Sequence, residues 1–149
     1  MVKKAILFCG ILFAALPLAY AQETFRISGS VRFQEDADIC IALLTKTEWW
    51  KMTISDTTIL APGPRTIVIK PTLEQKKAKK AAFEFIGVPR GSYGIRVFQD
   101  VNQNGELDRH TFGDIKEPYA SYRLAGETDW ENIKFQVNED IKGIDIQLR

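Results

Sequence analysis

Apolar and polar residues alternate along most of this chain, which is the period-two pattern of β-strands that bury one face. In residues 24–33, "TFRISGSVRF", the apolar side chains of Phe25, Ile27 and Val31 fall on the same face. Such runs, separated by polar, glycine or proline breaks, predict seven or eight strands, at residues 24–33, 37–46, 50–60, 65–71, 81–88, 93–100, 132–137 and 143–149. We therefore expect an all-β fold, a single antiparallel β-sandwich of the immunoglobulin or transthyretin type, with the last two strands joined as a hairpin.

Helical periodicity is weak throughout the chain. Residues 72–81, "TLEQKKAKKA", lack the apolar stripe by which a helix docks, so they predict at most a turn or two of helix. Their four lysines are open to two interpretations, a patch for polyanions or a solvated connection between strands, and the balanced charge of the chain favours the connection. Trp49 and Trp50 are adjacent, so on a strand one would enter the core and the other would meet solvent.

The first 21 residues have the pattern of a secretory signal peptide. Lys3 and Lys4 precede an apolar run, and "AYA" ends that run with small residues at the spacing of a cleavage site after Ala21. A retained membrane anchor is the alternative, but Pro17 and the shortness of the run argue against it. We expect export to the periplasm or beyond, one domain at residues 22–149, and no transmembrane segment after cleavage.

Charge and cysteine content narrow the class of protein. Removing residues 1–21 takes two of the 20 basic residues and none of the 19 acidic ones, so the net charge changes from +1 to −1. That balance gives no reason to expect binding to nucleic acid or to an anionic membrane. Cys40 then remains as a single cysteine inside the apolar run "DICIALL", which predicts a buried thiol and no internal disulfide.

The stretch "DVNQNGELD", residues 100–108, carries the clearest candidate chemistry. Acidic and amide residues occupy alternate positions and Gly105 follows them, in the order D-x-[DN]-x-[DN]-G of a calcium-binding loop. Oxygen atoms at alternate positions of a coiled loop can converge on one Ca²⁺, and a glycine at the sixth place allows the sharp turn. The predicted calcium ligands are Asp100, Asn102, Asn104, Glu106 through its carbonyl, Asp108 and, from the following turn, Glu117.

The loop is nevertheless not an EF-hand. Thr111 stands at the twelfth place, where a bidentate glutamate belongs, and the residues before the loop have a strand pattern instead of a helical one. Glu117 or Asp114 would have to complete the ligand shell, and calcium affinity would be modest, with a Kd of about 10⁻⁴ to 10⁻³ M as in extracellular modules. The alternative is that the Asp and Asn side chains only bind backbone N–H groups in Asx-turns, without a metal.

Catalysis is not expected. His110 is the only histidine, two residues from Asp108, and no motif supplies it with a nucleophile, while the apolar setting of Cys40 makes a poor thiolate. Tyr119 and Tyr122 could stack on a sugar ring, but ordinary packing is the favoured explanation. The expected function is a non-catalytic structural or binding module. The alternative is a calcium-assisted carbohydrate-binding module of the cell envelope, whose partner would be a glycan or a protein.

The segment "FEFIGVPRGSYGIRVFQDVNQNGELD", with "FGDIKEPYASY" after it, resembles the bacterial secreted family known as domain of unknown function 2141. The matching positions are Phe85, Val88, Pro89, Gly91, Tyr93, Ile95, Val97, Asp100, Asn102, Asn104, Gly105, Asp108, Gly113 and Glu117. The chain departs from the family at Ile115, where proline is frequent, at Gln99, where histidine is frequent, and in a longer segment between residues 49 and 80. The resemblance implies an exported immunoglobulin- or transthyretin-like sandwich with no established activity.

Two neighbouring families are informative by comparison. The P-x-G-x-Y stretch at residues 89–93 is also similar to the carboxypeptidase regulatory-like domains, which are non-catalytic accessory sandwiches. The transthyretin-related hydroxyisourate hydrolases need several histidines and a C-terminal Y-R-G-S, whereas this chain has one histidine and ends "DIQLR". That hydrolase activity is therefore not expected.

Overall fold

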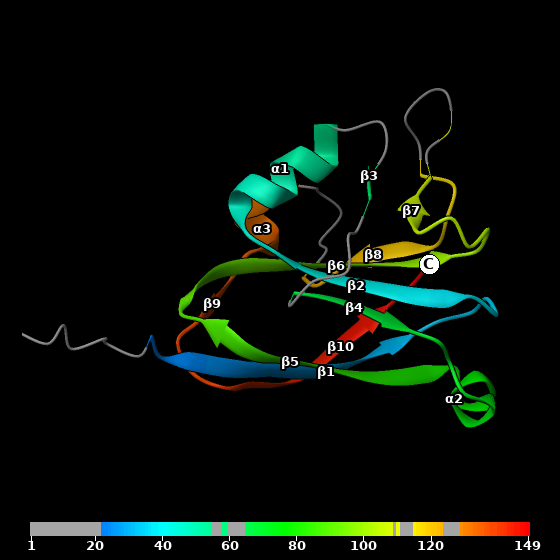
Figure 1. Ribbon diagram of the computed structural model, residues 1–149, viewed down its shortest axis with the longest axis horizontal. Helices are drawn as coiled ribbons and strands as arrows, with labels where there is room; N and C mark the ends of the chain where they lie inside the picture. The colour runs from blue at the N-terminus through cyan, green and yellow to red at the C-terminus, as the bar shows by residue number, and fades with distance from the viewer. Residues whose placement is uncertain (1–21, 55–57, 60–64, 109, 111–114, 124–128) are drawn as a thin grey trace, which may run out of the picture.

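The computed structural model describes residues 22–54, 58–59, 65–108, 110, 115–123 and 129–149. The predicted signal peptide at residues 1–21 and the predicted turn "APGP" at residues 61–64 lie outside the described residues. Two β-sheets pack face to face, and two helices with a loop cover the outer face of the larger sheet (Figure 1). The predicted all-β sandwich is confirmed.

The smaller sheet has three strands in the order β10–β1–β5. Its members are β1 (Thr24–Arg32), β5 (Lys80–Pro89) and β10 (Ile141–Gln147). The β1–β5 pair is antiparallel, as predicted, but β1 and β10 are parallel. The sandwich is therefore mixed at this edge, because the chain enters β10 from the other sheet instead of from an adjacent antiparallel strand.

The larger sheet has five strands. Four of them follow the order β4–β2–β6–β8, and β9 pairs with the first residues of β6 beside β8. They are β2 (Asp38–Leu44), β4 (Thr66–Ile69), β6 (Gly91–Asp100), β8 (Tyr119–Ser121) and β9 (Phe135–Val137). A separate two-stranded pair joins β3 (Thr58–Ile59) to β7 (Glu106–Leu107).

The predicted C-terminal hairpin is wrong. Strand β9 pairs with β6 and strand β10 with β1, so residues 138–140 carry the chain from one sheet to the other. The reason is burial: Phe135 and Val137 from one sheet and Ile144 and Ile146 from the other enter the same central core from opposite sides. A hairpin would have placed all four side chains in one sheet.

The larger sheet is buried on both faces. Its inner face, with Ile39, Ile41 and Leu43 of β2, joins the central core between the sheets. Its outer face carries Cys40 and Ala42, which belong to a second apolar cluster together with Leu44, Trp49, Phe98, Leu107, Trp130 and Ile133. We call this second cluster the outer core. Burial on both faces explains why β2 reads as a continuous apolar run in the sequence.

Helix α1 (Lys46–Ile54) replaces the first part of the strand predicted at residues 50–60, of which Thr58 and Ile59 form β3. Thr45 and Glu48 form a capping arrangement in which the Glu48 carboxylate accepts the N–H and the hydroxyl of Thr45, both at 2.7 Å. Trp49 is 1% exposed in the outer core, whereas Trp50 is 48% exposed. The predicted division of the two tryptophans between core and solvent is thus confirmed, although it arises on a helix.

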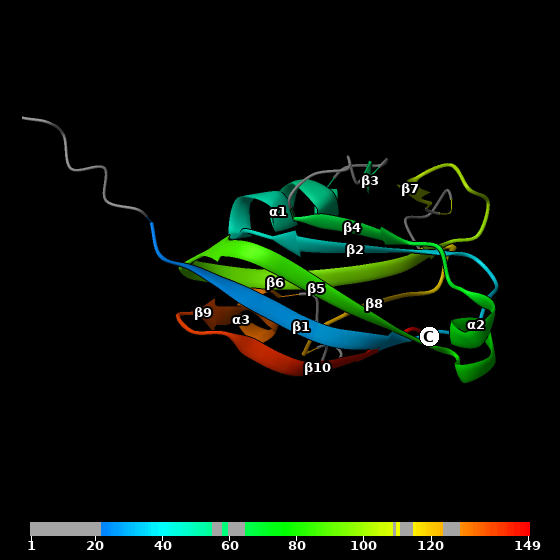
Figure 2. The same cartoon turned by 60° about the horizontal axis from the view of Figure 1, so that its bottom comes forward.

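Two shorter helices complete the fold. Helix α3 (Trp130–Ile133) lies where the predicted strand at 132–137 begins and carries two side chains of the outer core. Helix α2 (Leu73–Ala78) has a capping box between Thr72 and Gln75 and buries no residue. It links β4 to β5 and lies beside the β1–β2 connection, where Lys76 pairs with Asp36 (Figure 2). Within the described chain, no helix is long and apolar enough to cross a membrane.

Candidate metal-binding loop

The loop at residues 100–108 begins where β6 ends and is held down by its last residues. Leu107 is 1% exposed and packs into the outer core. Residues Glu106 and Leu107 form β7, which pairs with β3. Asp100, the last residue of β6, is 5% exposed. The two ends of the loop are therefore anchored to packed structure, while the residues between them face solvent.

The carboxylate of Asp100 organises the turn. Its Oδ1 accepts the N–H of Asn104 at 3.0 Å and its Oδ2 accepts the N–H of Gly105 at 2.8 Å. Gly105 has φ +76° and Gln103 has φ +61°, so the chain enters the left-handed region twice within three residues. Glycine adopts that conformation without steric cost, which is the role predicted for Gly105.

The side chains at the third, fifth and ninth places of the loop meet one another. The carboxylate of Asp108 accepts from the amide nitrogen of Asn102 at 2.5 Å and from that of Asn104 at 3.3 Å. The amide oxygens bind the backbone, because Asn102 Oδ1 accepts the N–H of Asn104 and Asn104 Oδ1 accepts the N–H of Glu106. These contacts are the Asx-turns expected for such residues, with Asp108 at their centre.

Glu117 closes the loop from the following turn. One carboxylate oxygen accepts the N–H of Val101 at 2.9 Å and the other accepts the N–H of Asp108 at 3.2 Å, so this single side chain ties the loop's beginning to its end. Glu117 is 7% exposed. Burial raises the pKa of the carboxyl, repulsion from Asp100 and Asp108 acts in the same direction, and the two backbone hydrogen bonds oppose them.

Sequence reasoning missed Asp38. It begins β2 and lies directly opposite Asp100 in the β2–β6 register, so both side chains project from the outer face of the sheet. Cys40, two residues further along β2, is buried as predicted. Burial raises the pKa of its thiol to about 12, and the carboxylates of Asp100, Asp38 and Glu117 add to that rise. Alternation along β2 could have placed Asp38 and Cys40 on one face, but their approach to Asp100 depends on strand pairing.

Negative charge is concentrated at this end of the sheet. Among the residues that the structure describes, no lysine or arginine forms an ion pair with Asp38, Asp100, Asp108 or Glu117. In the same residues, histidine, cysteine, aspartate and glutamate side chains form no group of three or more that could hold a metal ion. Any ion held here would therefore need amide or backbone oxygens in addition to carboxylates.

The remaining candidate residues lie apart from this arrangement. His110 is exposed, and Asp114, the alternative to Glu117, lies outside the described residues. Tyr122 packs edge-on against Phe135, with ring centroids 5.5 Å apart, and borders the central core. Tyr119 packs against the outer core. The two tyrosines thus pack against different cores, which agrees with the interpretation that ordinary packing explains them.

Comparison with known proteins gives a family and no activity. The family model described as "Uncharacterized protein conserved in bacteria (DUF2141)" matches residues 33–144, which include the larger sheet, the whole loop and strand β5, but not β1 or the end of β10. No curated protein and no solved structure matches the chain.

Proposed function

The chain belongs to the DUF2141 family of uncharacterised proteins conserved in bacteria, and from that premise we propose that it is an exported, non-catalytic module whose loop at residues 100–108 binds one calcium ion. The ligands would be oxygens of Asp100, Asn102, Asn104, Glu106, Asp108 and Glu117. The ion would join the end of β6 to the turn that carries Glu117, and so stabilise one end of the sandwich.

The convergence of the loop side chains is the observation that carries this proposal. Asn102 and Asn104 both reach the Asp108 carboxylate, so three residues that are spaced along the loop meet at one place. Each amide presents its nitrogen there, and rotation of the amide would present oxygen instead. Amide oxygens facing a carboxylate repel it unless a cation lies between them, which makes the orientation of the two amides dependent on calcium.

The electrostatics of the loop favour a cation in the same place. Three carboxylates, those of Asp100, Asp108 and Glu117, lie close enough for repulsion to raise the pKa of Glu117. Asp100 and Glu117 use their oxygens to accept backbone N–H groups, but a carboxylate offers about four lone-pair sites, so sites remain for a metal. A hard cation would offset both the repulsion and the burial of these charges.

Calorimetric titration of the protein, purified without residues 1–21 and stripped with EDTA, tests the proposal directly. We expect one saturable site with a Kd of about 10⁻⁴ to 10⁻³ M. At a calcium concentration about 100 times the Kd, the free energy of unfolding should rise by about 2.7 kcal/mol, because the ion binds only the folded loop. The absence of both binding heat and thermal stabilisation at millimolar calcium would remove the proposal.

Matched variants separate a specific site from general attraction of calcium to acids. Asp108→Asn removes a ligand charge and should weaken binding at least about tenfold. Glu106→Gln removes the same charge from the same loop but keeps the backbone carbonyl, so its affinity should stay within about threefold of the parent protein. Equal losses of calcium affinity in the two variants would mean that calcium binding depends only on the net charge of the loop.

The same assignment favours binding over catalysis. Cys40 is buried with a thiol pKa of about 12, which leaves it protonated at neutral pH and unsuited to act as a nucleophile. His110 is exposed, and no hydrogen bond within the described residues joins it to another side chain. We further propose that residues 1–21 direct export, because a millimolar Kd is useful only where calcium is abundant. N-terminal sequencing of the protein recovered from the periplasm and medium tests this, and an intact Met1 would contradict it.

A further inference from the structure

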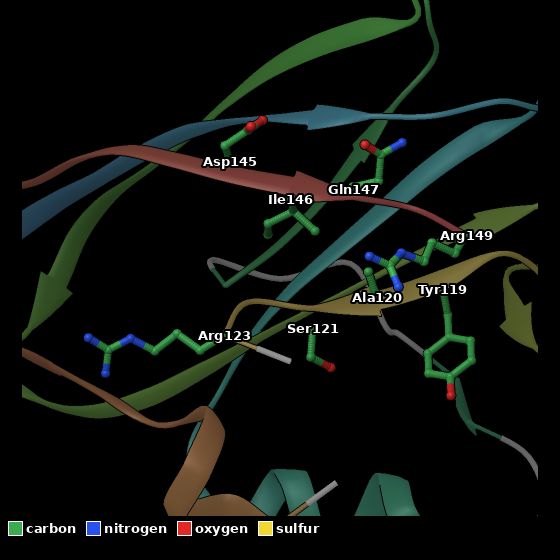
Figure 3. Close-up of a pocket in the computed structure, with 8 residues that line it drawn as sticks. All are labelled: Tyr119, Ala120, Ser121, Arg123, Asp145, Ile146, Gln147 and Arg149. Atoms are coloured by element: carbon green, nitrogen blue, oxygen red, sulfur yellow. The ribbon is translucent and has the colours of Figure 1, made fainter. Parts of the chain in front are cut away.

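A groove of about 400 Å³ lies between β8 and β10. These strands are the edges of the two sheets on the same side of the sandwich, and Figure 3 shows them running in opposite directions on either side of the groove. The groove is lined by Tyr119, Ala120, Ser121, Arg123, Asp145, Ile146, Gln147 and Arg149. It is separate from the metal-binding loop, whose residues do not line it.

The opposite side of the sandwich is closed by the chain itself. There the edge strands are β4 and β5, and α2 connects one to the other across the gap between the sheets. No such connection joins β8 to β10, because β8 leads towards α3 and β10 follows β9. The groove therefore lies where two sheet edges face each other without a covalent crossover.

The outer edge of β8 presents backbone groups to the groove. Pro118 O accepts the N–H of Gln99 at 2.9 Å, and Tyr122 N donates to Ile95 O at 3.0 Å, so these two residues face β6. Backbone groups of a strand alternate in direction, and those of Tyr119 and Ser121 consequently point away from β6. In the described chain, no hydrogen bond uses them.

The outer edge of β10 has the same property. Leu148 N donates to Arg32 O at 2.9 Å, which turns the backbone of Leu148, and with it that of Ile146, towards β1. The N–H and C=O groups of Asp145, Gln147 and Arg149 then point to the open side. They too take part in no hydrogen bond among the residues described. Both walls of the groove therefore offer unpaired strand edges.

The second half of β10 lacks the usual protection of an edge strand. Gly143, with φ +76°, lies where the pairing with β1 shifts register, and such irregularities discourage pairing with a new strand. From Ile144 to Gln147 the pairing with β1 is regular, and this stretch contains neither proline nor lysine. A free strand could therefore pair with β10 along these residues.

The charges around the groove indicate what kind of strand would fit. Asp145 is neutralised by Arg32, whose Nη2 lies 2.6 Å from its carboxylate. Arg123 and Arg149 form no ion pair among the described residues, so two guanidinium groups border the groove without a carboxylate partner there. Figure 3 places them towards opposite ends of the groove. An acidic segment would complement both ends.

We propose that this groove binds an extended acidic peptide segment of another polypeptide, which pairs with β10 as a fourth strand of the smaller sheet. The Cα atoms of β8 and β10 approach within 8 Å. The two strands do not pair with each other, and a guest strand bonded to both would need about twice the 4.8 Å spacing of paired strands, which is wider than this gap. The guest consequently pairs with β10 and lies beside β8.

A peptide assay separates backbone pairing from simple charge attraction. The probe is a fluorescein-labelled peptide of alternating valine and glutamate, about six residues long. The first control has the same side chains with every backbone nitrogen methylated, so it cannot donate backbone hydrogen bonds, and the second replaces glutamate by lysine. We expect the N-methylated peptide to bind at least about tenfold more weakly, since each lost hydrogen bond weakens binding roughly fivefold.

Variants of the protein test whether the probe binds along β10. Gln147→Pro removes an N–H from the open edge without removing a bond to β1, and should weaken binding about tenfold, whereas Gln147→Thr keeps the N–H and should not. Arg123→Glu tests the charge at the groove without changing the backbone, and should also weaken binding. If Gln147→Pro fails to fold, as judged by circular dichroism, the N-methylated peptide still tests the pairing. All titrations contain EDTA, so they do not depend on the metal-binding loop.

Three results would overturn the proposal. One is the absence of anisotropy change with the probe up to about 1 mM, beyond the range of useful affinities. A second is equal binding of the N-methylated peptide, which would leave only charge attraction. The third is a dimer of the protein alone in sedimentation that Gln147→Pro abolishes, since the occupant of the edge would then be a second copy of this chain.

Discussion

Glu117 holds the loop together at the scale of a single residue. Its carboxylate accepts two backbone N–H groups, from Val101 and from Asp108, in a site where it is 7% exposed. Buried carboxylates favour the neutral form unless a positive charge or enough donors compensate. In Glu117 the donors do not compensate fully, because its pKa is raised. The ionised side chain is therefore a source of instability that a bound cation would relieve.

The raised pKa predicts how stability depends on pH. The folded protein holds the Glu117 proton above the ordinary value of 4.5, so the unfolded state loses its proton first. Glu117 should then reduce the free energy of unfolding as pH rises from about 4.5 through the higher folded-state pKa. We expect the stability of the parent protein relative to Glu117→Gln to fall over that range in EDTA. Urea denaturation at several pH values measures the difference.

Calcium provides the control for this pH effect. An ion that binds the ionised carboxylate lowers its folded-state pKa, so saturating calcium should abolish the fall or reverse it. Other groups also titrate, such as Glu48, whose pKa is lowered in the folded protein despite partial burial because Thr45 and Arg65 bind it. The comparison with Glu117→Gln at each pH cancels their contribution to the stability. A relative stability that does not change with pH in EDTA would contradict the assigned environment of Glu117.

The spacing of residues within the loop was sufficient to predict most of its turn contacts. Asp100, Asn104 and Gly105 contact one another over four or five positions, and such local contacts follow from residue type and order. Glu117 could be proposed because it comes soon after the loop in the chain. Asp38 could not, because it meets Asp100 only through the register of β2 with β6, and register depends on the packing of the whole sheet.

At the scale of elements, capping residues decided where helices begin. The segment at residues 45–54 contains β-branched and aromatic residues that favour a strand, yet it forms α1. Thr45 and Glu48 have the spacing of a capping box, and Thr72 and Gln75 have the same spacing before α2. That signal was present in the sequence and outweighs the weak periodicity of both segments.

The two caps give a matched prediction for stability. Thr45→Ala removes the hydroxyl that contacts Glu48 and should lower the free energy of unfolding by about 1–2 kcal/mol, because α1 carries Trp49 into the outer core. Thr72→Ala removes an equivalent cap from α2, which buries no residue, and should cost less than about 0.5 kcal/mol globally. Urea denaturation followed by circular dichroism compares the two. Equal costs would show that α1 is not needed to cover the sheet.

At the scale of the whole molecule, the larger sheet is the middle one of three layers, between the smaller sheet and an outer layer of helices and loop. Strands β2 and β6 contribute side chains both to the central core and to the outer core. The outer layer of α1, α3 and the loop at residues 100–108 therefore cannot detach without exposing one face of the larger sheet (Figure 1). We infer that the sandwich and its outer layer unfold together.

The three tryptophans make this cooperativity measurable. Trp49 and Trp50 lie on α1 and Trp130 on α3, so tryptophan fluorescence reports only the outer layer. Far-ultraviolet circular dichroism reports mainly the two sheets. We expect both signals to change at the same urea concentration, as in a two-state transition. An earlier fluorescence transition would mean that the outer layer is a separate unit of lower stability.

The sequence alone determined most of the strands, the sandwich class, the burial of Cys40 and the turn contacts inside the loop at residues 100–108, because period-two burial and short-range turns are local properties. The tertiary structure decided which strands pair, that β9 and β10 lie in different sheets, and that Asp38 faces Asp100. It also decided that two strand edges face each other across a groove. These features rest on contacts between distant residues, which form only where burying apolar surface outweighs the entropy of closing the chain.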